Sequence, residues 1–237
     1  MSRIEDNLKV INDRIANACA KSGRYVEEIK LVIVTKSATP EQIKEVVRLG
    51  YTELGENRVQ NLKKVAEEVA EFVAEMPASK RKKINWHMIG HLQRNKVKQA
   101  MDTASLIHSV DTLRLAEEIN SIAARTGNKA KILMEINAAE EVQKYGVPIG
   151  AAIHLAEQIE TLPNVELCGL MAMGPLTEND EQIRLCFSRV RELFIEMRGE
   201  RVVGKQFREI SMGMSNDYHI AIEEGTTMLR IGSAIFN

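Results

Sequence analysis

Hydrophobic and polar residues follow two alternating patterns along the chain. From Ile4 to Ala18 an apolar residue recurs at every third or fourth position, which places these residues on one face of an amphipathic helix. Leu31–Lys36 then forms a short run rich in β-branched residues, which is typical of a buried strand. The same succession recurs to the C-terminus, so helices and strands are expected to alternate throughout.

Seven further apolar runs predict seven further strands. These runs are Thr52–Glu56, Ile84–Ile89, Ser105–Val110, Lys131–Asn137, Val165–Met173, Phe207–Met212 and Thr227–Ile231. A helix is expected between each successive pair of strands, with the weakest pattern over Leu92–Met101. Thr39, Asp111 and Ser215 are the predicted N-caps of three helices, because each offers a side-chain oxygen that can accept a hydrogen bond from the first turn.

This alternation predicts a parallel sheet covered by helices. Eight strand–helix units in 237 residues match the size of a (β/α)8 TIM barrel, here with an additional N-terminal helix. No linker, repeat or low-complexity segment interrupts residues 1–237, so we expect a single domain. The alternative is a doubly wound open sheet, but the segment after its first strand would usually be glycine-rich, and here it reads Lys36-Ser37-Ala38-Thr39.

Composition and charge exclude several classes of protein. The chain has 32 Lys and Arg residues and 33 Asp and Glu residues, a net charge of −1, whereas a non-specific nucleic-acid binder needs clustered positive charge. Its three scattered cysteines, Cys19, Cys168 and Cys186, suit neither a disulfide framework nor a zinc site. The N-terminus is polar, and no apolar run approaches the roughly 18 residues of a membrane helix. We therefore expect a cytoplasmic protein without nucleic-acid or membrane partners.

The first candidate for chemistry is Lys36, because active sites of TIM barrels lie at the C-terminal ends of the strands. By strand alternation Lys36 shares a face with Val32 and Val34, and that face is expected to point into the barrel. A lysine there would be partly desolvated, which frees its amine to attack a carbonyl carbon. The alternative is that Lys36 simply begins an exposed loop.

Two segments of small residues predict a phosphate site. Ser211-Met212-Gly213-Met214-Ser215 follows the seventh strand and leads into a short helix, whose first N–H groups can bind an anion. Arg230-Ile231-Gly232-Ser233 ends the eighth strand, and barrel enzymes often bind phosphate between these two loops. The alternative is a capped helix and a turn. A nucleophilic lysine facing a phosphate site suits a phosphorylated aldehyde, and these residues leave both pyridoxal 5′-phosphate (PLP) and a sugar phosphate open.

Six segments in a fixed order extend over nearly the whole chain. They are Val34-Thr35-Lys36, Leu54-Gly55-Glu56-Asn57, Trp86-His87-Met88-Ile89-Gly90-His91-Leu92-Gln93, Gly169-Leu170-Met171-Ala172-Met173, Ser211-Met212-Gly213-Met214-Ser215 and Arg230-Ile231-Gly232-Ser233-Ala234-Ile235-Phe236. Together they resemble the YggS/PROSC type of PLP-binding protein, the pyridoxal phosphate homeostasis proteins. The resemblance implies a barrel similar to the N-terminal domain of alanine racemase.

The resemblance also implies roles for individual residues. Lys36 would carry the cofactor as an internal aldimine, and Arg230 would face its pyridine nitrogen. An arginine there can only donate hydrogen bonds, so it keeps that nitrogen unprotonated and makes the ring a poorer electron sink. The implied phosphate cup comprises Ser211, Gly213, Met214, Ser215, Gly232 and Ser233.

The expectations for two further residues and one loop are weaker. Asn57 and His87 are candidate cofactor contacts, although Asn57 could instead cap the next helix and His87 could be a hydrogen-bonded core residue. The family usually has a Ser-Lys-x-Gly pattern after the fifth strand, and here Gln143-Lys144-Tyr145-Gly146 stands in its place. This departure leaves the role of that loop open.

The resemblance bears on whether the chain is an enzyme. Alanine racemase places a lysine on one face of its cofactor and a tyrosine from a second domain on the other. This chain ends six residues after its last predicted strand, and only Tyr145 among its tyrosines lies in a loop on the expected active-site face. We therefore expect a protein that sequesters and delivers PLP without dedicated turnover. A small PLP-dependent racemase or lyase is the alternative, and a sugar-phosphate aldolase is the third.

Several partners are expected from this interpretation. They are PLP itself, PLP-dependent apo-enzymes that receive it, and amino acids. The parts through which related racemases dimerise are not expected here, so a monomer is favoured.

Overall fold

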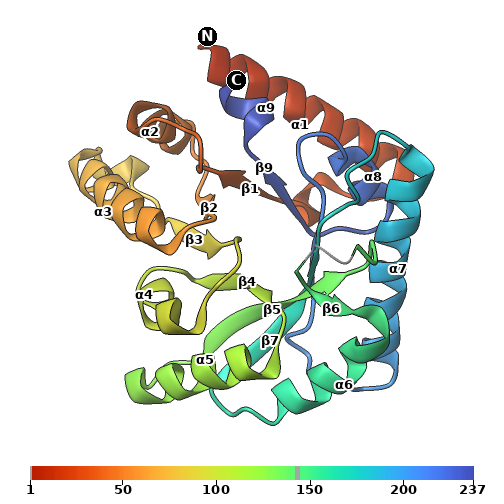
Figure 1. The fold of residues 1–237 in the computed structure, drawn as a ribbon. Helices are drawn as coiled ribbons and strands as arrows, with labels where there is room; N and C mark the ends of the chain where they lie inside the picture. Colours follow the sequence, from red (N-terminus) through yellow and green to blue (C-terminus); the bar gives the residue numbers. More distant parts are fainter. Residues whose placement is uncertain (1, 142–144) are drawn as a thin grey trace.

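The alternating strands and helices close into a ring, with the parallel sheet inside and the helices outside (Figure 1). The computed structural model describes residues 2–141 and 145–237. Within these residues, eight strands form the ring, and its last strand pairs with its first. In ring order they are β1 (Lys30–Val34), β2 (Glu53–Glu56), β3 (Asn85–Met88), β4 (Leu106–Val110), β5 (Ala130–Asn137), β7 (Val165–Ala172), β8 (Glu209–Ser211) and β9 (Met228–Ile231). The predicted (β/α)8 barrel is confirmed.

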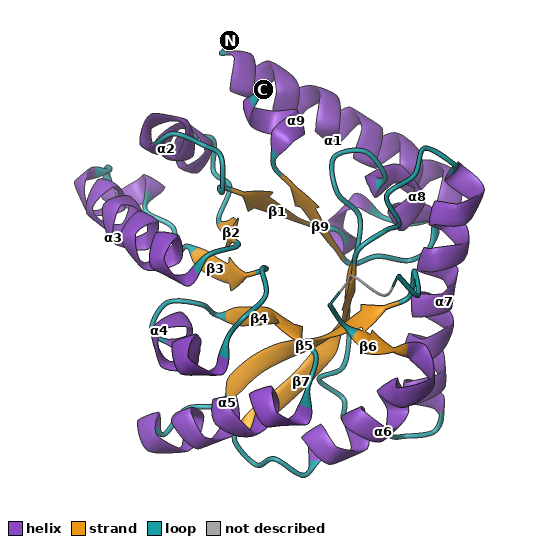
Figure 2. Cartoon of the chain, viewed as in Figure 1, coloured by secondary structure: helices purple, strands orange, loops and turns teal. Residues whose placement is uncertain are grey.

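Helices follow the strands and form the outer layer (Figure 2). They are α1 (Arg3–Ser22), α2 (Pro40–Arg48), α3 (Val59–Glu75), α4 (Val97–Met101), α5 (Leu113–Thr126), α6 (Ile149–Glu160), α7 (Asp180–Gly199), α8 (Tyr218–Glu223) and α9 (Ser233–Phe236). Short 3₁₀ turns lie at Val26–Glu28, Ala78–Lys80 and Arg94–Lys96, so the helix expected over Leu92–Met101 is shorter than predicted. A two-residue strand that sequence analysis missed, β6 (Val147–Pro148), pairs with β5 beside the ring.

The three predicted helix caps have different outcomes. Thr39 caps α2 as predicted, because its hydroxyl accepts a hydrogen bond from the N–H of Gln42. The prediction for Asp111 is wrong by one residue, since the hydroxyl of Thr112 caps α5. The prediction for Ser215 is also wrong, because α8 begins after Asp217 and the Ser215 hydroxyl is used elsewhere.

Helix α1 completes the outer layer beside the last strand. In this chain β9 is followed by the four-residue α9, which is too short to cover the sheet. The twenty-residue α1 instead packs against α8, α9 and α2, and its apolar stripe from Ile4 to Ala18 is buried there. The Asn7 side-chain amide donates hydrogen bonds to the carbonyls of Ile235 and Asn237, so the two ends of the chain lie together (Figure 1).

The two faces of the strands have different environments. The outward faces pack against the helices in the main core, whereas a second apolar cluster comprises Leu106, Leu133, Cys168, Met171 and Met228. These five residues come from four strands around the ring and pack on one another, so they lie inside the barrel. The remaining interior positions are unusually polar for a barrel, which is normally filled by Val, Ile and Leu side chains.

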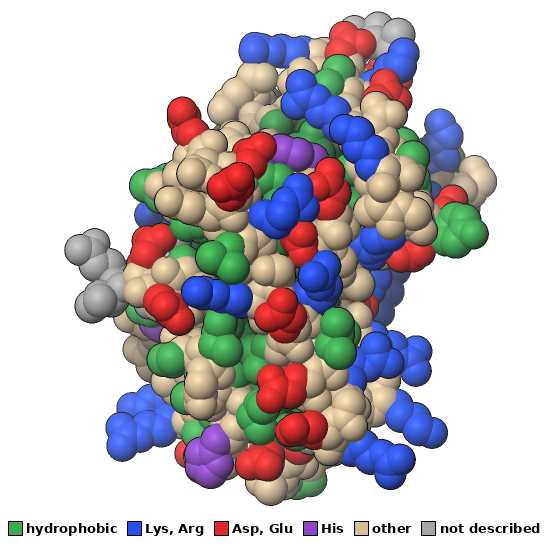
Figure 3. Space-filling model, turned by 90° about the vertical axis from the view of Figure 1, so that its right-hand side faces the viewer, with side chains coloured by type: hydrophobic (Ala, Val, Ile, Leu, Met, Phe, Trp, Pro, Cys, Tyr) green, Lys and Arg blue, Asp and Glu red, His purple; other side chains and the backbone are tan. Residues whose placement is uncertain are grey.

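Ion pairs link the outer helices near the end of the chain. Glu224, at the C-terminal end of α8, pairs with Arg184 at 2.9 Å and with Arg191 at 2.8 Å, and both arginines lie on α7. The face over these helices shows basic and acidic side chains interspersed (Figure 3). These pairs fix α8, and with it the loop that follows β8. In the described part of the chain, no helix is both long and apolar enough to cross a membrane.

Candidate functional site

Lys36 lies in a turn directly after β1, at the C-terminal mouth of the barrel, where the strands end. Its side chain is exposed, so the expected desolvation is wrong for this structure: the strand ends at Val34, and Lys36 has left the packed interior. The turn is anchored from below, because the buried Thr35 hydroxyl donates to a carboxylate oxygen of Glu56 at 3.0 Å. The amine is therefore held near the mouth and is open to a ligand.

The loops after β8 and β9 meet, as the sequence predicts. The N–H of Arg230 donates to the carbonyl of Gly213 at 3.0 Å. The Ser233 hydroxyl donates to the Ser215 hydroxyl at 3.0 Å, and the N–H of Ala234 also points at the Ser215 oxygen, at 3.3 Å. The two segments thus form one hydrogen-bonded cup.

The cup has backbone donors to offer an anion. Within the described residues, the N–H groups of Ser215 and Asn216 have no hydrogen-bond partner, and Ser233 begins a helix, where the N–H has no intrahelical acceptor. Met214 differs from expectation, because its N–H is already donated to the side chain of Asp217. The free donors are those that a phosphate group would need.

Two glycines let the backbone form this cup. Gly213 has a φ of 93°, and a Cβ there would lie 2.6 Å from the Cβ of Ala221. A Cβ on Gly232 would lie 2.8 Å from the carbonyl oxygen of Val34, two residues before Lys36. The cup is therefore packed directly against the end of β1 that carries the lysine.

Arg230 lies buried below the cup. One terminal nitrogen donates to both the carbonyl and the hydroxyl of Ser211 at 2.7 Å, and the other donates to the carbonyl of Ala172 at 2.9 Å. Three of its five N–H groups are thus used, and two have no acceptor among the described residues. Burial lowers the pKa of Arg230 to about 10, although Glu135 and Asp217 oppose the shift, so the group stays cationic at neutral pH.

Glu135 is an interior carboxyl group that sequence analysis missed. It lies on β5, and burial together with the nearby Asp111 raises its pKa to about 7, while Arg230 lowers it. The signal was present in the sequence: Leu133, Glu135 and Asn137 alternate with the outward residues of an otherwise apolar run.

His87 and Asn57, the two weaker candidates for cofactor contacts, have different environments. Both ring nitrogens of His87 are hydrogen-bonded inside the barrel, to Glu53 at 2.7 Å and to His108 at 2.8 Å, which leaves none for a cofactor. The alternative reading, a hydrogen-bonded core histidine, describes His87 here. Asn57 is half-buried at the C-terminal mouth, and its side chain has no hydrogen bond within the described residues. It does not cap α3, which begins after Arg58.

An aromatic pair lies at the same mouth. The rings of His91 and Tyr145 stack with their centroids 4.0 Å apart. Tyr145 is exposed, as expected for a loop aromatic, and Gly146 passes close to the backbone of Asn137. Gln143 and Lys144 of the loop that departs from the family pattern lie outside the described residues.

Comparisons with known proteins agree with this fold. Residues 2–237 match the family model for the N-terminal domain of alanine racemase. The pyridoxal phosphate homeostasis protein of Aquifex aeolicus is 39% identical over 231 residues, which cover 98% of this chain and 96% of that protein. A crystal structure of an unknown protein from Bifidobacterium adolescentis has 35% identity and a TM-score of 0.92, and covers 99% of this chain and 94% of its own.

A second solved structure includes the cofactor. PipY of Synechococcus elongatus with PLP bound is 28% identical, with a TM-score of 0.79, and the alignment covers 94% of this chain and 100% of that one. The chain described here therefore belongs to the alanine racemase N-terminal domain family and, within it, to the pyridoxal phosphate homeostasis proteins.

Proposed function

We propose that the protein binds PLP through a Schiff base to Lys36 and takes part in PLP homeostasis by holding and delivering the cofactor. The observation that carries this proposal is the cup formed by the loops after β8 and β9, which has free N–H donors and packs against the end of β1. The curated relatives carry the name of homeostasis proteins, and PipY was solved with PLP bound, both of which support it.

Each residue has a distinct task in this proposal. The cup, with Ser215, Gly232 and Ser233 at its centre, binds the phosphate through backbone N–H groups and hydroxyls. Lys36 supplies the amine that links to the aldehyde carbon, and Arg230 directs an unused N–H toward the pyridine nitrogen. Bound PLP is an electron sink for amino-acid chemistry, and a donor-only arginine at its ring nitrogen keeps that sink weak.

The same arrangement supports a carrier role. The exposure of Lys36 gives water and incoming amines access to the cofactor link, which favours release and transfer over protected carbanion chemistry. We therefore propose a cytoplasmic protein without dedicated turnover, whose partners are PLP-dependent apo-enzymes and amino acids. A monomer remains the prediction.

The absorption spectrum tests the site. Purified protein with added PLP should show a yellow band that borohydride fixes covalently, and the Lys36→Ala variant should lose both the band and the covalent label. Lys98→Ala is the matched control, because Lys98 is an exposed lysine on α4 whose one ion pair in the described part of the chain is with Asp102. A colourless wild-type protein that takes up no PLP would exclude PLP as the ligand and favour a sugar phosphate as the substrate. A Lys36→Ala variant that is still labelled would place the link on another lysine.

A transfer assay distinguishes carrier from enzyme. PLP-loaded protein should activate a PLP-dependent apo-enzyme. It should show no steady turnover of the L or D form of any common amino acid. Turnover that disappears in the Lys36→Ala variant would contradict the carrier role and support a racemase or lyase.

A further inference from the structure

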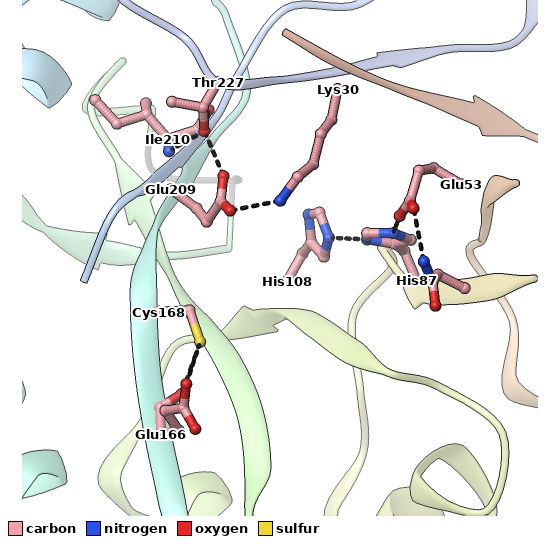
Figure 4. A network of polar contacts seen from close by, with 10 residues as sticks. Lys30, Glu53, His87, His108, Glu166, Cys168, Glu209, Ile210 and Thr227 are labelled. Atoms are coloured by element: carbon pink, nitrogen blue, oxygen red, sulfur yellow. Dashed lines mark hydrogen bonds and ion pairs between the residues drawn. The ribbon is translucent and has the colours of Figure 1, made fainter. Parts of the chain in front are cut away.

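Five polar side chains form one hydrogen-bonded chain through the interior of the barrel. Arg230 donates to the Ser211 hydroxyl at 2.7 Å, and that hydroxyl lies 3.1 Å from Nδ1 of His108. Nε2 of His108 lies 2.8 Å from Nδ1 of His87, whose Nε2 lies 2.7 Å from a carboxylate oxygen of Glu53 (Figure 4). Each residue lies on a different strand, so the chain runs across the ring from β9 to β2.

The chemistry of the members fixes the direction of every hydrogen bond. An arginine can only donate, so the Ser211 oxygen accepts from Arg230, and Nδ1 of His108 is the acceptor left within the described residues for its single hydrogen. Ser211 is fully buried and has no third partner within the described residues.

The direction continues through both histidines. With Nδ1 of His108 accepting, a neutral His108 carries its hydrogen on Nε2 and donates it to Nδ1 of His87. His87 then carries its hydrogen on Nε2 and donates to the Glu53 carboxylate. Both rings are therefore neutral Nε2–H tautomers.

The electrostatic environment agrees with a neutral His108 and an ionised Glu53. Burial, the largest cause, holds the pKa of His108 well below its usual value, so the ring is neutral. Burial raises the pKa of Glu53, but hydrogen bonds from His87 and Asn85 outweigh this effect and lower it, so the terminal acceptor is a carboxylate.

The far end of the chain opens to solvent. Glu53 lines a cavity of about 460 Å³ at the N-terminal mouth of the barrel, where the strands begin, together with Lys30 and Glu209 (Figure 4). The chain thus joins the buried cation below the phosphate cup to a carboxylate at the opposite mouth. Barrel interiors are usually filled by apolar side chains, so a hydrogen-bonded polar chain of this length is unusual there.

We propose that His108 and His87 are positioning residues for Arg230, which hold the Ser211 hydroxyl as an acceptor and so keep Arg230 in the orientation that offers an unused N–H to the cofactor. This inference rests on the proposed function, in which Arg230 faces the pyridine nitrogen. If His108 did not accept the Ser211 hydrogen, the hydroxyl could turn and Arg230 would lose a fixed partner.

The tautomers are measurable in cofactor-free protein, independently of PLP binding. Long-range ¹H–¹⁵N spectra of histidine-labelled protein should show His87 and His108 both protonated at Nε2 and unprotonated at Nδ1, with assignment by His87→Gln and His108→Gln. Arg230→Met should shift the Nδ1 signal of His108, although Arg230 does not contact that ring, and Glu166→Gln in the same N-terminal cavity should leave it unchanged. An Nδ1–H tautomer or an imidazolium at either ring at pH 7 would overturn the inference.

The link to the cofactor has its own readout. Ser211→Ala should raise the dissociation constant for PLP about fivefold, the worth of one hydrogen bond, and shift the absorption maximum of the bound cofactor. Ser211→Thr keeps the hydroxyl and should restore both, and His108→Gln should change the absorption maximum in the same direction as Ser211→Ala. If PLP affinity and the absorption spectrum are unchanged in Ser211→Ala, the positioning role is wrong and the proposed function is unaffected. If the wild-type protein binds no PLP, the proposed function is wrong, and the predicted tautomers can still be tested.

Discussion

The buried interior of the barrel disfavours the ionised form of the Glu135 carboxyl group. Its pKa is raised to about 7, mainly by burial, whereas it is near 4.5 in the unfolded chain. Between these values the folded protein keeps a proton that the unfolded chain has lost, so stability falls as the pH rises from about 4.5 to 7. Glu135→Gln removes this effect. We expect the variant to gain stability over the wild type by about 2 kcal/mol more at pH 8 than at pH 5, since one pKa unit corresponds to about 1.4 kcal/mol.

Urea unfolding at the two pH values measures this difference. Glu67→Gln is the control, because Glu67 is exposed on α3 and, among residues 2–141 and 145–237, forms an ion pair with Lys63 alone, so its effect should be the same at both pH values. A Glu135→Gln variant whose gain is independent of pH would show that Glu135 is ionised in the folded protein throughout this range.

At the scale of single residues, the sequence predicts what lies at strand ends better than what lies inside the barrel. Lys36 and the small residues around Gly213 follow strands, where polar and flexible residues are conspicuous. His108 and Glu135 lie within buried runs, and their roles depend on which strands become neighbours across the ring. For the same reason, alternation predicts the face on which His87 lies but does not decide between a cofactor contact and a hydrogen-bonded core residue.

The loop after β8 depends on one glycine. Gly213 has a φ of 93°, and its substitution by alanine adds both backbone strain and a contact of 2.6 Å with the Cβ of Ala221 on α8. We expect Gly213→Ala to destabilise the protein by about 2–4 kcal/mol and to weaken PLP binding more than about tenfold, because the cup must shift. Thermal unfolding and PLP titration measure the two effects.

Gly127→Ala separates strain from contact. Gly127 ends α5 with a φ of 69°, and a Cβ there meets nothing within 4 Å. Its substitution should cost only about 1 kcal/mol, the strain of the left-handed conformation, and should leave PLP binding unchanged. Equal effects of the two substitutions would show that the contact with Ala221 is relieved without moving the cup.

At the scale of elements, the hydrophobic pattern predicted the barrel strands and most helices, but not their first residues. Pattern arguments locate an apolar stripe, whereas a cap depends on the local path of the backbone. Thr112 rather than Asp111 caps α5 because its hydroxyl reaches the N–H of Leu115. Serine is a common N-cap residue, but the Ser215 oxygen accepts hydrogen bonds from the loop after β9 instead. A local pattern does not show such a contact between distant segments.

The whole molecule closes differently from the simplest expectation. The sequence predicts eight strands with a helix between each successive pair, and an additional N-terminal helix. In the structure α9 has four residues, and α1 covers the sheet beside it, packing on both α8 and α9. The hydrophobic pattern could not predict this packing, because it does not show that the two ends of the chain lie together.

This closure makes α1 part of the barrel's outer wall, and a pair of adjacent residues tests it. Ile11 is 3% exposed within the main core, whereas its neighbour Val10 is 49% exposed on the opposite face of the helix. Ile11→Ala should lower the free energy of unfolding by about 2–4 kcal/mol, because it removes buried methyl groups and leaves a cavity. Val10→Ala, which removes methyl groups from an exposed position, should change it by less than about 0.5 kcal/mol. Urea unfolding followed by circular dichroism gives both values in one transition. If Ile11→Ala were as mild as Val10→Ala, α1 would be a peripheral addition, and the sheet beside β9 would be stable without it.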